Sequence, residues 1–130
     1  MSKYLFLCLI LSFLLKNADS LKCEFFTRKT VHVFNDLPNE TLFVHCKSED
    51  NKDLGVHYVK AKQDYNFEFC SMTYITLYTC HVQWGKNKLS FEAYNGNWVF
   101  DNPCAWQECR WAAKPDGLYL QGLKKFDWKQ

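Results

Sequence analysis

The sequence has 130 residues, of which 48% are hydrophobic and 23% charged, and its formal net charge is +2 at pH 7. This length and composition predict a single globular domain that can bury a core. The near balance of charge argues against a nucleic-acid partner held mainly by phosphate contacts, because such binding needs a strongly basic face.

Residues 1–20 are predicted to be a secretory signal peptide. Lys3 supplies the positive start, and residues 4–15 form an apolar run that is short for the roughly 20 residues of a membrane-spanning helix. Ala18 and Ser20 are the small residues that place cleavage after Ser20. The competing interpretation, a short membrane anchor, is disfavoured by length and flanks. We expect a secreted domain over residues 21–130 that does not insert into a membrane.

The rest of the sequence has the two-residue period of β-strands. In chain order, strand-like runs occur around Val31 and Val33 and at residues 41–46, 56–60, 65–69, 74–84, 89–94, 97–100, 109–113 and 118–120. Turn signals separate them at residues 36–39, 84–87 and 114–117, and Asn95-Gly96 predicts a tight hairpin. No window of 11 or more residues has a helical stripe. Short, evenly spaced strands predict an all-β sandwich or barrel.

Cysteine usage fits an oxidising compartment. Cys8 would leave with the signal, and six cysteines remain: Cys23, Cys46, Cys70, Cys80, Cys104 and Cys109. An even number in a small secreted chain predicts disulfides, although six cysteines allow 15 connectivities. Asn39 begins the sequon Asn-Glu-Thr in a turn-like segment, and we expect it to carry a glycan.

The stretch around His45 and Cys46 is the first candidate for chemistry. Cys46 could act as a nucleophile with His45 or His57 as its base, but neighbours on one strand point to opposite faces. The loop residues Glu49, Asn51 and Asp53 alternate as calcium ligands do. The pattern nevertheless lacks the glycine and the bidentate glutamate of a helix–loop–helix calcium site.

Other candidates lack local support. The four histidines, His32, His45, His57 and His81, lie on different predicted strands without zinc-site spacing, although folding could bring two together. A sugar-stacking platform could use Trp98, Trp106, Trp111 and Trp128, but tryptophans in a small β-domain more often fill the core. We expect no catalytic site, no metal and no cofactor.

Three elements form a fairly specific combination: Cys-Lys-Ser at 46–48 with Asp-Leu-Gly at 53–55, Cys80 ahead of Gln-Trp at 83–84, and Cys-x-Trp at 109–111. With the runs at 30–37, 42–45 and 67–69, Cys104 and Asp-Gly at 116–117, they resemble the plant self-incompatibility S1 family over roughly residues 30–120. The resemblance implies an all-β fold, a small antiparallel β-sandwich stapled by disulfides, with no catalytic site.

For its best-understood members, the resemblance implies a stigma ligand that meets a pollen membrane protein. On a self match, such a ligand stops pollen growth through a calcium-dependent signal. Many other members have no established role. On this basis we expect a secreted ligand of a cell-surface receptor, with recognition in the loops at residues 36–40, 48–53, 84–88, 94–97 and 101–108. The alternatives are a secreted carbohydrate-binding or defence protein, and a secreted hydrolase that uses His45 or His81.

The chain departs from the family pattern at its cysteines. Many members carry one cysteine just after Asp-Gly and another near the C-terminus, where this chain has Leu118, Tyr119 and residues 126–128. The Asp-Gly-Leu-Tyr form resembles the stigmatic S proteins. Cys23 and Cys70 do not match family positions, and we expect them to bridge to each other. For the four family cysteines, the expected pairs are Cys46–Cys109 and Cys80–Cys104.

Overall fold

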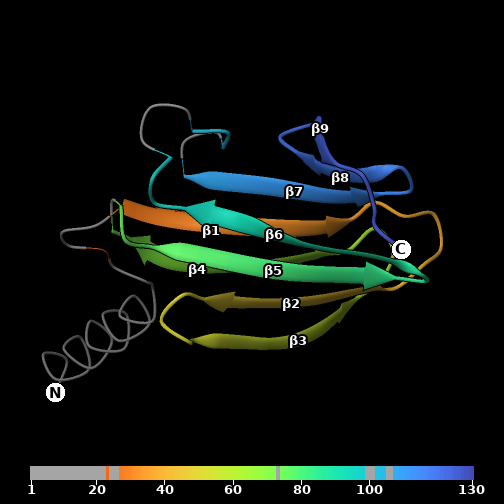
Figure 1. The fold of residues 1–130 in the computed structure, drawn as a ribbon, viewed down its shortest axis with the longest axis horizontal. Coiled ribbons are helices and arrows are strands. Elements are labelled where there is room, and N and C mark those ends of the chain that lie inside the picture. Colours follow the sequence, from red (N-terminus) through yellow and green to blue (C-terminus); the bar gives the residue numbers. More distant parts are fainter. Residues whose placement is uncertain (1–22, 24–26, 73, 99–101, 105–106) are drawn as a thin grey trace, which may run out of the picture.

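The computed structural model describes residues 23, 27–72, 74–98, 102–104 and 107–130 (Figure 1), so the predicted signal peptide lies outside the described residues. The described residues are organised into nine strands without a helix: β1 (Thr27–Asn35), β2 (Leu42–Ser48), β3 (Asp53–Val59), β4 (Asp64–Ser71), β5 (Leu77–Trp84), β6 (Asn87–Asn95), β7 (Glu108–Lys114), β8 (Gly117–Leu120) and β9 (Leu123–Phe126). Among these residues, no helix is long and apolar enough to cross a membrane.

The strands form two sheets that pack face to face as a sandwich (Figure 1). One sheet has the order β4-β1-β7-β8-β9 and the other has the order β3-β2-β5-β6. The predicted all-β sandwich is therefore confirmed. One pairing differs from the expected antiparallel arrangement. Strands β1 and β7 run parallel, with Val31 opposite Cys109 and Val33 opposite Trp111.

The core lies between the two sheets and follows the alternation seen in the sequence. Side chains that face inward from both sheets are almost fully buried, among them Val31, Val33, Leu42, Val44, Val82, Phe91, Trp111, Leu118 and Leu120. Along β1, β2 and β5, the neighbours of these side chains are partly or fully exposed. This is the pattern of antiparallel sheets with one buried and one solvated face. Packing of these two apolar faces is what holds the sandwich closed.

Asn35 is a buried polar residue at the end of β1. Its side-chain amide donates to the carbonyls of Glu40 at 2.7 Å and Val59 at 2.8 Å, and its Oδ1 accepts from the N–H of Leu37 at 3.0 Å. Since a buried polar group is destabilising unless it is hydrogen-bonded, these three bonds favour one conformation of the connection between β1 and β2.

Several expected elements differ in the structure. Residues 74–76 lie before β5 in a turn, and residues 97–98 are not in a strand, while 99–100 fall outside the described residues. The expected hairpin at Asn95-Gly96 is absent, because Asn95 ends β6, Gly96 lies in the turn after it, and the next strand, β7, belongs to the other sheet. The tight hairpin joins β5 to β6 at Gly85 and Lys86. Strand β9 was not predicted, because all four of its side chains are exposed and it is held by backbone pairing with β8.

Three disulfides join described residues, and none of them links one sheet to the other. The structure contains the expected bridge Cys23–Cys70, which attaches the N-terminal arm to β4. The other two expected pairs were wrong, because the structure pairs Cys46 with Cys80 and Cys104 with Cys109. Cys46 and Cys80 are directly opposite each other on the adjacent strands β2 and β5, whereas Cys109 belongs to the other sheet.

Candidate recognition surface

The residues that suggested nucleophilic chemistry are used for structure. Cys46 is bridged to Cys80 and therefore offers no thiol. The Nε2 atom of His45 lies 2.7 Å from Oδ1 of Asp53, across the hairpin from β2 to β3. The same Asp53 oxygen accepts the backbone N–H of Gly55 at 2.7 Å. These contacts, the Gly55 bond first, lower the pKa of Asp53.

Folding brings two of the four histidines together. His45 and His81 are cross-strand neighbours on β2 and β5, and each alternates with buried residues, so both lie on the outer face of the four-stranded sheet. The Nε2 atom of His45 contacts Asp53, and the Nδ1 atom of His81 lies 2.8 Å from the hydroxyl of Ser90. Both side chains lie on an open sheet face, where cross-strand polar contacts are common.

The remaining histidines have structural contacts. The ring of His57 stacks on Tyr65 at 4.1 Å between centroids. His32 contacts Asp64 at 2.9 Å and Glu108 at 3.3 Å, and so links β1 to the strands on either side of it. Across the part of the chain that the structure describes, no group of three or more His, Cys, Asp or Glu side chains is arranged to hold a metal ion.

The tryptophans do not form one exposed platform. Trp111 is 3% exposed, its ring packs on Phe91 at 4.6 Å, and its Nε1 donates to the carbonyl of Ala93 at 3.0 Å. Trp98 and Trp128 are partly buried against the same core. Trp106 lies outside the described residues. Trp111, at least, is a core residue, as tryptophans of small β-domains usually are.

The structure sorts the expected recognition loops between the two ends of the sandwich (Figure 1). Residues 36–40 and 84–88 lie at the end toward which β1 and β5 run. Asn39 is exposed there. Residues 48–53 and 94–97 lie at the opposite end, together with the described part of residues 101–108. At that end they meet residues 72 and 74–76, between β4 and β5.

Backbone hydrogen bonds join these segments into one surface. The N–H of Glu49 donates to the carbonyl of Leu77 at 3.0 Å, and the N–H of Gly96 donates to the carbonyl of Thr76 at 2.7 Å. The carbonyl of Gly96 accepts the N–H of Tyr74 at 3.0 Å. We call residues 49–52, 72, 74–76 and 95–97 the loop surface. Its segments come from three separate loops but are fixed relative to one another.

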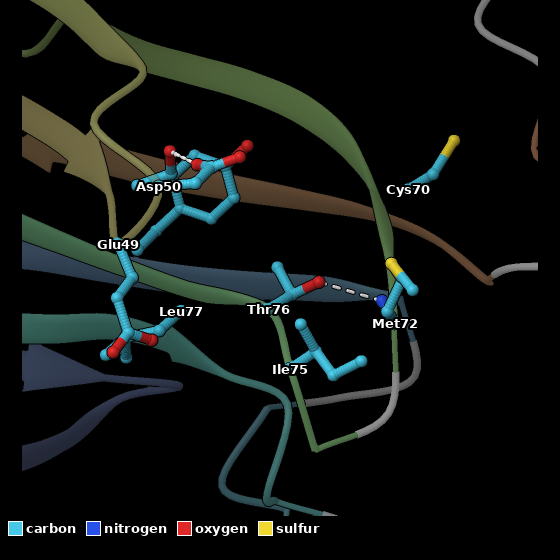
Figure 2. A pocket seen from close by; sticks show the side chains of 9 residues that line it. Glu49, Asp50, Cys70, Met72, Ile75, Thr76 and Leu77 are labelled. Atoms are coloured by element: carbon cyan, nitrogen blue, oxygen red, sulfur yellow. Dashed lines mark hydrogen bonds between the residues drawn. The ribbon is translucent and has the colours of Figure 1, made fainter.

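The loop surface exposes apolar side chains beside acidic ones. Tyr74 is 64% exposed and Ile75 is 63% exposed, and Met72 is exposed next to them. A pocket of about 400 Å³ lies between the first two loops and is lined by Ser48, Glu49, Asp50, Cys70, Met72, Ile75, Thr76, Leu77 and Tyr78. Figure 2 shows Glu49 and Asp50 on one side of this pocket and Met72, Ile75 and Thr76 on the other. Adjacent exposed apolar side chains at a pocket are typical of an interaction site.

Sequence reasoning missed the central part of this surface. Residues 74–76 continue the period of β5, so they are expected to be strand. In the structure Tyr74 has a φ of 68°, in the left-handed region that ends an extended run. Thr76 then anchors the turn, because its Oγ1 accepts the N–H of Met72 at 2.8 Å. A lone Tyr-Ile-Thr segment carries no local signal for such a turn.

The chain is similar to a well-populated plant family. The family model described as plant self-incompatibility protein S1 matches residues 30–130. S-protein homolog 5 of Arabidopsis thaliana is 34% identical over 108 residues, which cover 81% of this chain and 81% of that protein. S-protein homolog 1 of the same plant is 34% identical over 92 residues, which cover 69% of this chain but 60% of that longer protein.

A solved structure has the same fold. It belongs to the SPH (self-incompatibility protein homologue) proteins, described as small, highly stable, secreted proteins from plants. It superposes with a TM-score of 0.62 and 20% sequence identity, covering 82% of this chain and 98% of that one. At this level of identity the likeness supports the sandwich architecture.

Proposed function

Because the chain belongs to the plant self-incompatibility protein S1 family, we propose that it is a secreted, non-enzymatic signalling ligand that acts on a cell-surface receptor. By resemblance, the receptor is a pollen membrane protein and the response is a rise in cytosolic calcium. The S-protein homologues that the chain matches carry names that state no receptor, so the ligand role is taken from the family as a whole.

The loop surface is the observation that carries this proposal. Tyr74 and Ile75 stay exposed although the chain has a large buried core, and backbone bonds to Gly96 hold them in place. Because the backbone of these loops is already fixed, little backbone conformational freedom is lost when a partner binds. Such a surface is suited to protein recognition, with an apolar centre and a polar rim.

The test is binding to living cells. The full chain would be expressed through a eukaryotic secretory pathway, labelled, and added to germinating pollen of several incompatibility genotypes. We expect saturable binding with tube arrest and a calcium rise in some genotypes, and loss of both after reduction of the disulfides. Absence of binding in every genotype, by protein whose fold is verified by circular dichroism, would contradict the proposal.

Two matched variants locate the binding surface. Tyr74→Asn removes an exposed aromatic ring from the loop surface and keeps a residue that tolerates the left-handed backbone. Tyr58→Thr removes a ring that is 71% exposed on β3, at a distance from the loop surface, and keeps a good strand former. We expect the first variant to weaken cell binding and the second to leave it unchanged.

A further inference from the structure

The pocket of the loop surface has a distinctive chemistry. The described residues that line it include two carboxylates, on Glu49 and Asp50, and no cationic side chain. Neither carboxylate is in an ion pair with a described residue; Asp50 accepts a hydrogen bond from the hydroxyl of Ser48. The opposite wall is made by Met72 and Ile75. An anionic wall therefore faces an apolar wall.

A third group adds an unused polar atom. Tyr78 lines the pocket and is 7% exposed, yet its hydroxyl forms no hydrogen bond with any described residue. Burial and the nearby Asp50 carboxylate raise the pKa of Tyr78, so the hydroxyl keeps its proton. The Tyr78 oxygen is not one of the buried unpaired side-chain atoms of the described residues, so it is open to the pocket and can bond to an atom of an incoming ligand.

We propose that this pocket binds a polypeptide segment of the receptor in which a lysine or arginine is adjacent to a large apolar side chain. The cationic group lies at the Asp50 carboxylate and the Tyr78 hydroxyl, the Glu49 carboxylate adds negative charge at the rim, and the apolar side chain covers Met72 and Ile75. This inference rests on the proposed function and names the chemistry of the partner.

Charge and shape together select a polypeptide over a metal ion. The side chains of Glu49 and Asp50 extend in different directions from their loop, so they flank the pocket and do not converge on one point (Figure 2). A divalent cation needs several oxygen ligands within about 2.6 Å of one centre. The apolar area also continues from the pocket onto the exposed side chain of Tyr74, which a bound metal ion would leave uncovered.

Fluorescence anisotropy with short peptides tests the inference directly. The probe is a fluorescein-labelled peptide, Gly-Ser-Leu-Arg-Leu-Ser-Gly, with one analogue carrying citrulline for arginine and another carrying serine for both leucines. The protein is the full chain processed by a eukaryotic secretory host. We expect each analogue to bind about tenfold more weakly, since a charge-assisted bond or a buried leucine contributes of that order. Binding of the parent peptide should weaken as salt rises.

Three variants separate the pocket from the rest of the chain. The double variant Glu49→Gln with Asp50→Asn keeps the hydrogen-bond acceptors but removes both charges. We expect it to weaken binding of the arginine peptide about tenfold or more. Tyr78→Phe removes the unpaired hydroxyl without breaking a bond within the described part of the fold, and is expected to weaken it severalfold. Glu40→Gln lies in the loop at the opposite end and should leave binding unchanged.

Each outcome decides one point. Equal binding of the arginine and citrulline peptides, or unchanged binding by the charge-neutral double variant, overturns the inference. Displacement of the probe by spermidine, with no contribution from the leucines, also overturns it in favour of a small polycation. If the wild type binds no cells but binds the arginine peptide, the proposed function fails alone. If the double variant still binds cells as the wild type does, this inference fails alone.

Discussion

The carbonyl of Gly96 accepts a hydrogen bond from the backbone N–H of Tyr74 at 3.0 Å. This bond joins the loop after β6 to the loop before β5, although the two residues are 22 positions apart in the chain. A Cβ atom added to Gly96 would lie 2.8 Å from the carbonyl oxygen of Met72 and 3.1 Å from that of Thr76. Glycine is required here by close backbone approach.

Gly96→Ala should therefore separate the two loops. We expect the free energy of unfolding to fall by about 1–3 kcal/mol, the usual effect of inserting a methyl group where the backbone cannot yield. The measurement is urea denaturation followed by tryptophan fluorescence. Asn97→Ala, at an exposed side chain in the same loop, is the control and should change stability by less than about 0.5 kcal/mol. Equal stability of the two variants would contradict the close packing of Gly96.

The three disulfides should differ in their contribution to stability. Their sequence separations are 47, 34 and 5 residues for Cys23–Cys70, Cys46–Cys80 and Cys104–Cys109. In the chain-entropy model, removing the first or the second lowers the free energy of unfolding by about 4 kcal/mol, and removing the third by about 2 kcal/mol. The order of these contributions can be measured by chemical denaturation of three variants, each with both cysteines of one bridge replaced by alanine.

The pairing itself can be tested by peptide mapping. Non-reducing digestion and mass spectrometry should recover the peptides of Cys46 and Cys80 joined to each other. Recovery of a peptide that joins Cys46 to Cys109 would contradict the structure. A free thiol at Cys23 would show that the N-terminal arm is not attached to β4.

Acid should weaken the contacts between β1 and β7. A hydrogen bond from His32, together with the adjacent charge of Arg110, lowers the pKa of Glu108 below its ordinary value of about 4.3. A carboxyl with a lowered pKa in the folded state stabilises the fold fully above its unfolded pKa, and this contribution is lost as pH falls through the lower, folded value. Stability is thus expected to decline below about pH 4.

The urea midpoint, measured from pH 6 down to pH 2.5, shows this decline. Glu108→Gln should lower the midpoint at pH 6 and make it vary less with acid. Gln107→Ala, at the exposed neighbouring position, is the uncharged control and should keep the wild-type profile. A profile of Glu108→Gln that parallels the wild type at every pH would refute the role of this carboxyl.

Trp111→Ala should act on stability and not on sugar binding. The substitution removes a ring packed on Phe91 and the hydrogen bond to Ala93, so the expected loss is about 3–5 kcal/mol. Loss of glycan binding in this variant would then reflect unfolding. The measurement is thermal unfolding beside a glycan titration of the wild type. A shift in Trp111 fluorescence caused by sugar, with stability unaffected by the substitution, would restore the platform hypothesis.

The sequence by itself determined the class of fold. Alternation such as Leu42, Val44 and Cys46 against Phe43, His45 and Lys47 directs one set of side chains inward whatever the partner strand is. The family resemblance was also readable, because Cys-Lys-Ser, Asp-Leu-Gly and Cys-x-Trp are local in the chain. The bridge Cys23–Cys70 followed from the two cysteines that match no family position, and the structure contains it.

Only the tertiary structure decided which distant segments meet. The pairing of Cys46 with Cys80 depends on the register of β2 against β5, and the parallel contact of β1 with β7 joins strands more than 70 residues apart. Residues 74–76 continue a strand-like pattern, yet they form a turn, because Gly96 supplies backbone partners from a distant loop and the Thr76 side chain bonds back to Met72. The pocket between Asp50, Tyr78 and Ile75 exists for the same reason: side-chain periodicity specifies a face, whereas long-range register specifies the neighbours.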